Sequence, residues 1–203
     1  MTFRPLAALL LAASCASPPA SLREPTGEFQ PLEPGLQWTY DLDGQVQTRR
    51  VVGVERVGRF ECRVVETRTG STVQQSWMRS DKEGLKLYRV AEEGRIVEFD
   101  DPVLLIHRLA APGATWSFEE RHGPVTLTVS ARFEAEEEIS AANRRFRCAR
   151  IRLVKRVSGR VVVDQASWYA REVGLIRMTA TVAGQDKETK STLVLKSCSF
   201  LPD

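Results

Sequence analysis

Histidine is scarce in this sequence, and the local motifs that mark most hydrolases and metal sites are missing. Its two histidines are His107, in an apolar segment, and His122, before the turn residues Gly123-Pro124; we expect His107 to be structural and His122 to be exposed. The chain has no Gly-x-Ser-x-Gly, no His-Glu-x-x-His, no phosphate-binding glycine loop and no Cys-x-x-Cys pair. We therefore expect no catalytic residues, no metal, no cofactor and no enzymatic activity. A nucleophile and a base that meet only in the folded chain would leave no such motif, so a hydrolase stays the third alternative.

Net charge is also small. The chain has 29 basic and 26 acidic residues, a formal net charge of +3 at pH 7. Residues 1–14 contain one of the arginines, Arg4, and no acid, so the remainder has 28 basic against 26 acidic residues, or +2. Such an excess is too small for a general nucleic-acid-binding protein. We therefore expect no nucleic acid among the partners.

Long apolar runs are lacking after the first fifteen residues, and the run within them is short. Leu6–Ala13 contains only leucine and alanine, too few residues for a permanent membrane span, and is followed by Ser14 and Cys15. Small residues and then a cysteine after a short apolar core resemble the lipobox of bacterial lipoproteins, although Ala12 stands where leucine is frequent. The resemblance implies a signal peptide over 1–14, lipidation of Cys15 and a lipid anchor to the membrane. Ala16 and Ser17, with no aspartate after the cysteine, imply the outer membrane of the cell envelope.

The alternative is an ordinary cleaved signal followed by an incidental cysteine. Residues 15–28 are small and proline-bearing at their start, which predicts a flexible lipidated tether. Residues 29–203 are then long enough for a single domain with one core.

Cysteine is rare in that domain. The domain has three cysteines, Cys62, Cys148 and Cys198, so at most one disulfide can join two of them. Export would bring the chain into an oxidising compartment that permits a disulfide. Buried reduced thiols are the other interpretation, and the sequence leaves the choice open.

The rest of the chain is dominated by alternating apolar and polar residues, rich in β-branched and aromatic types, with turn residues about every ten positions. This pattern predicts an all-β, mainly antiparallel protein: a curved meander of about twelve strands forming a half-open barrel. The expected strands are 36–41, 46–57, 60–69, 72–79, 85–91, 95–99, 115–120, 125–139, 145–157, 160–170, 175–183 and 187–200. Residues 103–109 lack alternation and predict one short helix near 102–109, or a loop that plugs the sheet.

Three landmarks occur twice in the same order, which predicts an internal duplication. Gly35-x-x-Trp38-x-Tyr40 matches Gly113-x-x-Trp116-x-Phe118; Phe60-x-Cys62 matches Phe146-x-Cys148; Ser76-Trp77 with Gly84-Leu85 matches Ser167-Trp168 with Gly174-Leu175. We assign repeat one to 31–100, a linker to 101–111 and repeat two to 112–200. Paired aromatics in the opening strand of each repeat are more typical of a core than of a binding platform.

The Pro-Leu-x-x-Gly-x-x-Trp-x-Tyr opening at 31–40, Phe-x-Cys-x-Val at 60–64 and the late Trp168-Tyr169-Ala170 resemble a broad family of uncharacterised bacterial lipoproteins. The expected fold is similar to that of the LolA and LolB lipoprotein carriers, whose apolar concave face binds acyl chains. No binding residue of those carriers can be placed on this sequence, so the ligand-binding residues are unknown.

Charges are concentrated in one part of repeat two. Glu134 and Glu136–Glu138 precede a run with eight basic residues and no acid between 140 and 160. We expect these groups to pair across the sheet; a surface for anionic lipid headgroups is the alternative.

The leading functional hypothesis is a non-enzymatic outer-membrane lipoprotein that binds an apolar ligand, such as a lipid or acyl chain, or an envelope protein on its curved sheet. The alternative is a structural or assembly module with a filled core.

Overall fold

The fold is all-β. The computed structural model describes residues 28–108, 111–122, 124–184 and 187–201. These form twelve strands in one sheet and, within the described residues, no helix. The strands are β1 (Gln37–Leu42), β2 (Gln45–Val57), β3 (Phe60–Thr69), β4 (Thr72–Ser80), β5 (Gly84–Glu92), β6 (Arg95–His107), β7 (Thr115–His122), β8 (Val125–Ala141), β9 (Arg144–Val157), β10 (Arg160–Ala170), β11 (Gly174–Ala183) and β12 (Glu188–Cys198). The predicted class and strand number are confirmed.

Local sequence explains the hairpins. At the β1–β2 turn, Asp43 and Gly44 both adopt positive φ, at 49° and 86°. This is the geometry of a two-residue hairpin whose twist matches that of the strands it joins, and Asp-Gly is a favoured pair there. The Asp41 side chain accepts a hydrogen bond from the Gly44 N–H at 2.8 Å, which fixes the turn further.

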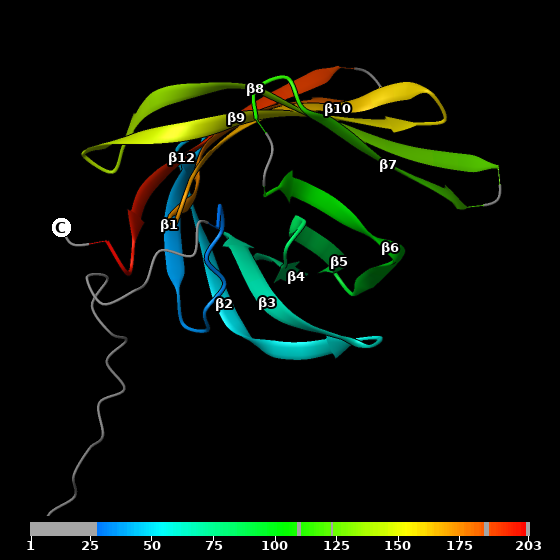
Figure 1. The fold of residues 1–203 in the computed structure, drawn as a ribbon, viewed down its shortest axis with the longest axis horizontal. Helices are drawn as coiled ribbons and strands as arrows, with labels where there is room; N and C mark the ends of the chain where they lie inside the picture. The colour runs from blue at the N-terminus through cyan, green and yellow to red at the C-terminus, as the bar shows by residue number, and fades with distance from the viewer. Residues whose placement is uncertain (1–27, 109–110, 123, 185–186, 202–203) are drawn as a thin grey trace, which may run out of the picture.

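The sheet is a nearly closed meander barrel. The strand order is β6-β5-β4-β3-β2-β1-β12-β11-β10-β9-β8-β7, and every neighbouring pair is antiparallel where the register is given. The first and last strands therefore pair with each other, Trp38 opposite Cys198 and Tyr40 opposite Leu195. The two edges left over, β6 and β7, approach each other without a backbone ladder and form one unsealed seam (Figure 1).

The prediction of a short helix or plug near 102–109 was wrong. Strand β6 continues to His107, with Val103 opposite Leu87 and Ile106 opposite Leu85 on β5. Two register shifts in this pair disturb the alternation of inward and outward side chains. Val103 and Ile106 are buried and the leucines between them are half-buried, so the run lacks the alternation that identifies a strand.

The two six-stranded halves share detailed backbone geometry, as the predicted repeat requires. The Gly35 N–H donates to the Val51 carbonyl at 2.8 Å, and the Gly113 N–H donates to the Phe133 carbonyl at 2.7 Å. A register shift follows Val51 in the β2–β3 pair and Phe133 in the β8–β9 pair. Further shifts follow Trp77 and Trp168 in the β4–β5 and β10–β11 pairs.

One end of the barrel is closed by residues 28–36, which we call the strap. The strap is tied to the β10–β11 turn, where the Glu172 N–H donates to the Glu28 carbonyl at 2.7 Å, and to β2 through Gly35. In the sheet order β2 is three positions from β11 and four from β10, so the strap crosses the end of the barrel (Figure 1). Its side chains Phe29, Gln30, Pro31, Leu32 and Leu36 are buried. Phe29, Leu32 and Leu36 belong to the main core, which explains why this end is packed.

Candidate functional site

The inner face of the barrel was the expected ligand site, and near the strap it is filled by the protein itself. Trp38 and Tyr40 are fully buried there. The Trp38 indole N–H donates to the Val173 carbonyl at 2.7 Å, and the Tyr40 hydroxyl donates to the Leu175 carbonyl at 3.2 Å. Burial raises the pKa of Tyr40 far above its ordinary value. The prediction that these aromatics belong to the core is confirmed for repeat one.

Beyond that core the inner face becomes polar. Arg49 lies opposite Trp38 on β2, so its side chain is on the same face, and its guanidinium carbon is 5.6 Å from the centre of the Tyr40 ring. Also on β2, Gln47 donates to the Thr69 hydroxyl at 2.9 Å, and on β10 Gln165 donates to the Ser167 hydroxyl at 2.8 Å. An acyl chain placed here would cover polar groups without bonding to them, which costs free energy.

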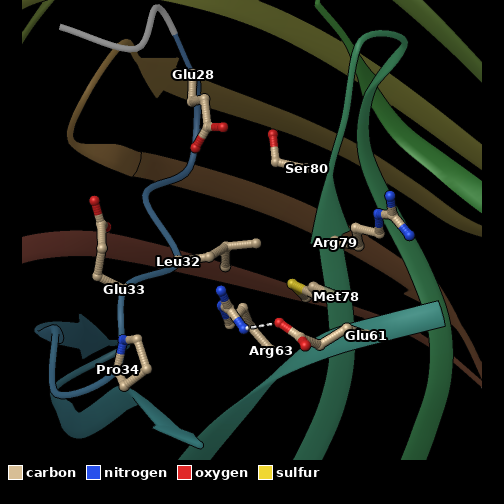
Figure 2. Close-up of a pocket in the computed structure, with 9 residues that line it drawn as sticks. All are labelled: Glu28, Leu32, Glu33, Pro34, Glu61, Arg63, Met78, Arg79 and Ser80. Carbon is tan, nitrogen blue, oxygen red and sulfur yellow. Dashed lines mark hydrogen bonds and ion pairs between the residues drawn. The ribbon is translucent and has the colours of Figure 1, made fainter. Parts of the chain in front are cut away.

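A hollow of about 420 Å³ lies between the strap and strands β3 and β4 (Figure 2). Its lining combines Glu28, Leu32, Glu33 and Pro34 of the strap with Glu61, Arg63, Met78, Arg79 and Ser80. The Arg63 and Glu61 side chains form an ion pair at 2.9 Å. Burial raises the pKa of Glu28, and a hydrogen bond with Ser80 opposes that effect. The lining mixes charged side chains of both signs with a few apolar ones, so an acyl chain bound here would also cover charged groups, which is unfavourable.

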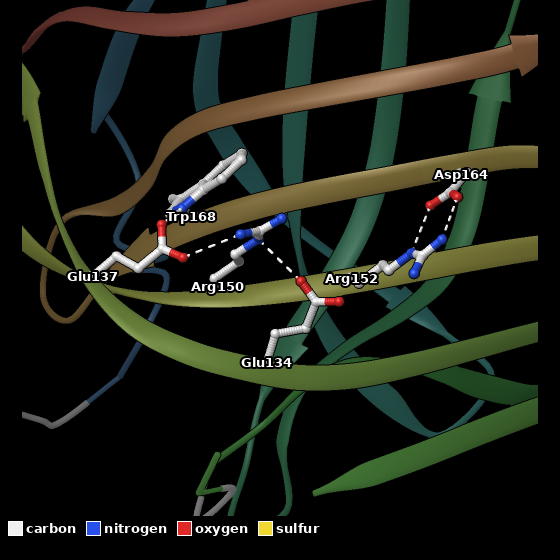
Figure 3. A network of polar contacts seen from close by, with 6 residues as sticks. All are labelled: Glu134, Glu137, Arg150, Arg152, Asp164 and Trp168. Atoms are coloured by element: carbon white, nitrogen blue, oxygen red, sulfur yellow. Dashed lines mark hydrogen bonds and ion pairs between the residues drawn. The ribbon is translucent and has the colours of Figure 1, made fainter. Parts of the chain in front are cut away.

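The outer face of repeat two carries the predicted charge pairing. Arg150 bridges Glu134 at 2.9 Å and Glu137 at 3.1 Å, and Glu137 also accepts the Trp168 indole N–H at 2.8 Å (Figure 3). On the opposite face of the same two strands, Arg147 pairs with Glu136. Hydrogen bonds from Trp168 and Arg150 lower the pKa of Glu137. The expectation that the acidic cluster pairs with the following basic run is confirmed.

This arrangement has a counterpart in repeat one that sequence reasoning missed. The Trp77 indole N–H donates to Glu55 at 2.8 Å, and Arg89 lies over the Trp77 ring at 5.2 Å, as Arg177 lies over Trp168 at 5.4 Å. Glu55 is opposite Cys62 on β3, and Glu137 is opposite Cys148 on β9. The number of residues between the glutamate and the cysteine differs between the two repeats. Only the cross-strand register therefore reveals that Glu55 corresponds to Glu137.

The remaining sequence-predicted residues serve structure where they are described. Cys62, Cys148 and Cys198 are buried free thiols with raised pKa values, chiefly because burial disfavours the thiolate. His107 ends β6 with its ring 6.4 Å from that of Trp116, across the seam. His122 ends β7, but its side chain lies outside the described residues, as do Cys15, the signal peptide over 1–14 and almost all of the tether.

No group of three metal-ligating side chains occurs within the described ranges. The same part of the chain contains no helix with the length and apolarity needed to cross a membrane.

Comparison with known proteins identifies the fold but no function. No protein-family model and no curated protein matches the chain. A predicted exported protein of Bacteroides fragilis, described as having a YmcC-like fold, superposes with a TM-score of 0.50 and 14% identity, over 85% of this chain and 99% of that one. The fold is similar to the YmcC-like fold. A predicted lipoprotein of Parabacteroides distasonis matches with a TM-score of 0.44 and 14% identity, over 85% and 98% of the two chains.

Proposed function

We propose that this protein is an exported lipoprotein, anchored to the outer membrane through Cys15, that acts without catalysis as a binding module for an envelope protein. The observation that carries the choice of partner is the packing of the inner face. Trp38, Tyr40, Leu193 and Leu195 leave almost no surface exposed there, and the strap covers their end of the barrel. A module whose interior is packed near the strap and polar beyond it offers little room for an enclosed acyl chain, which favours a protein partner bound at its edges or outer surface.

The seam between β6 and β7 offers the partner an edge. Ile96, Val97 and Glu98 pair with β5 on one side, and among the described residues their strand has no backbone partner on the other. Ile96 and Val97 are 66% and 48% exposed, and Val125, next to the end of β7, is 42% exposed. Unpaired backbone groups beside exposed apolar side chains are the features that an added strand uses.

Only part of this edge suits an added strand. Pro102 lacks an N–H donor, and the Asp100–Asp101 pair beside it is exposed and charged. Both features protect a strand edge against pairing. The docking segment on β6 is therefore the stretch from Arg95 to Phe99, where Phe99 also packs edge-to-face on Phe118 of β7 at 5.9 Å.

The lipid anchor sets the orientation of this edge. Cys15 and Glu28 are 13 positions apart, so the intervening chain spans at most about 45 Å when fully extended. The strap end of the barrel therefore stays near the membrane. The β5–β6 and β7–β8 hairpins, at the opposite end of an up-and-down meander, point away from it. The docking segment begins at the first of these hairpins and is accessible from the aqueous side.

A photo-crosslinking residue at Ile96 tests the docking edge in cells. Val46 is a matched control, because it is also 66% exposed and β-branched, but its strand, β2, has neighbours on both sides. We expect a discrete adduct from Ile96 and none from Val46. Equal adducts at the two positions, or a stoichiometric lipid in native mass spectra of the gently extracted protein, would refute the proposal.

The anchor is tested separately with Cys15→Ser. We expect this variant to leave the membrane pellet on cell fractionation. If it remains there to the same extent as the wild type, lipidation of Cys15 is not what holds the protein to the membrane.

A further inference from the structure

A second hollow, of about 580 Å³, lies on the outer face of strands β7, β8 and β9. It is lined by three arginines, three hydroxyl-bearing residues and a few others: Thr115, Trp116, Ser117, Ser130, Ala131, Arg132, Glu134, Arg152, Val154 and Arg156. With three arginines and one glutamate, its lining has a formal charge of +2, as large as the net charge of residues 15–203. The hollow therefore concentrates positive charge on a few neighbouring residues.

Two of the arginines face each other directly. Arg132 on β8 is opposite Arg152 on β9. The same place in repeat one, immediately before the shared register shift, has Arg50 opposite Glu66. Like charges directly opposite on neighbouring strands destabilise a sheet, whereas opposite charges stabilise it. Repeat two therefore has a repulsive pair at the position where repeat one has a complementary one.

The acids nearby do not neutralise this group. Arg152 donates to both carboxylate oxygens of Asp164, at 3.0 and 2.6 Å (Figure 3). Glu134 is engaged by Arg150. Within the described residues, the guanidinium groups of Arg132 and Arg156 form no ion pair or hydrogen bond, although Arg156 lies close enough to Asp164 to help lower the pKa of that carboxyl. Two guanidinium groups at the hollow are thus left to bind something else.

We infer that this hollow binds a phosphate group. Arginine guanidinium groups bind phosphate oxygens through paired charge-assisted hydrogen bonds. A phosphate monoester carries nearly two negative charges at neutral pH, which matches the local excess. The hydroxyls of Thr115, Ser117 and Ser130 supply further donors on the same face. The anion also relieves the repulsion between Arg132 and Arg152, and the site is separate from the β6 docking segment.

Calorimetric titration with glycerol 3-phosphate and with dihexanoyl phosphatidic acid tests the site on the full mature protein. We expect Arg132→Gln and Arg156→Gln each to weaken binding of both probes by about 10-fold or more, the usual effect of losing one charge-assisted hydrogen bond. Arg50→Gln is the matched control, because it removes the same charge at the equivalent position of repeat one. It should change the affinity less than about 2-fold, since exposed charges at a distance are screened.

The two probes also separate the sources of the phosphate. Tighter binding of the phosphatidic acid identifies a lipid headgroup as the ligand, and equal binding identifies a free phosphorylated molecule. An absence of binding by either probe, or an equal loss in Arg50→Gln, would overturn the inference.

A stability measurement provides an independent readout. Arg132→Glu recreates the opposite-charge pair of repeat one, so without phosphate it should melt at a higher temperature than the wild type. Glycerol 3-phosphate should raise the melting temperature of the wild type and leave that of Arg132→Glu unchanged. A variant that melts no higher than the wild type, and is still stabilised by the probe, would contradict the site.

Discussion

Trp38 and Trp116 occupy equivalent places in the two repeats, but their surroundings predict different contributions to stability. Trp38 is fully buried, donates to the Val173 carbonyl at 2.7 Å and meets the Phe200 ring edge-to-face at 5.6 Å. Truncation of a buried tryptophan to alanine costs about 3–5 kcal/mol. Trp116 donates to the Leu104 carbonyl at 2.9 Å across the seam, but it is only half-buried. Trp116→Ala should therefore cost about half as much, roughly 2 kcal/mol.

Urea unfolding followed by circular dichroism measures both free energies. For a domain of this size, the loss at Trp38 corresponds to a fall in melting temperature of roughly 10 °C. Trp38→Phe keeps most of the ring but leaves the buried Val173 carbonyl without its donor, which should cost about 1–3 kcal/mol. Equal losses from Trp38→Ala and Trp116→Ala would show that the seam is packed as tightly as the β1–β12 junction. A loss below about 1 kcal/mol at Trp38 would refute its place in the core.

Three further predictions concern stability and reactivity. Gly84 has φ at 145°, and a Cβ there would lie 1.9 Å from the Ile106 carbonyl oxygen. Gly84→Ala should therefore lower the free energy of unfolding in urea by about 3 kcal/mol or more. The control is Gly53→Ala, whose Cβ meets open space and which should cost less than about 1 kcal/mol. Burial raises the pKa of Glu28, so the folded state binds more protons just above the ordinary carboxyl pKa and stability falls as pH rises through that window. Glu28→Gln should abolish this fall in a series of melts from pH 4 to 7, and an unchanged pH profile would contradict the assignment. Burial also raises the pKa of Cys148 to about 12, so its thiol should resist iodoacetamide at pH 8 in the folded protein and react only after unfolding, as mass spectrometry would detect.

The strands could be predicted because their signals are local. Alternating side chains face opposite sides of a strand whatever the rest of the chain does, and pairs such as Asp43-Gly44 favour a hairpin through their own backbone preferences. The same reasoning failed at residues 103–107. Their burial depends on β5, on Trp116 across the seam and on two register shifts, none of which is encoded in the period of that segment.

The candidate sites depend on the cross-strand register more than the strands themselves do. The excess of arginine between 144 and 160 is visible in the sequence, and so is the acidic cluster before it. Whether Arg132 faces an acid or another arginine is decided by the length of the β8–β9 hairpin and by the shift after Phe133, which together set every cross-strand partner. The pairing of Glu55 with Trp77 also becomes visible only when three strands are aligned.

By itself, then, the sequence determined the all-β class, the approximate bounds of most strands and the repeated landmarks. It also determined the burial of the opening aromatics in repeat one. Each of these follows from residue types within one hairpin. Only the tertiary structure decided that the two ends of the chain pair with each other, that β6 and β7 remain unsealed, and that the strap fills one end of the barrel. The pairing of the chain ends and the strap join residues more than a hundred positions apart, such as Trp38 with Cys198 and Glu28 with Glu172. Such contacts form where the curvature of the whole sheet brings surfaces together, and no local pattern in the chain specifies that curvature.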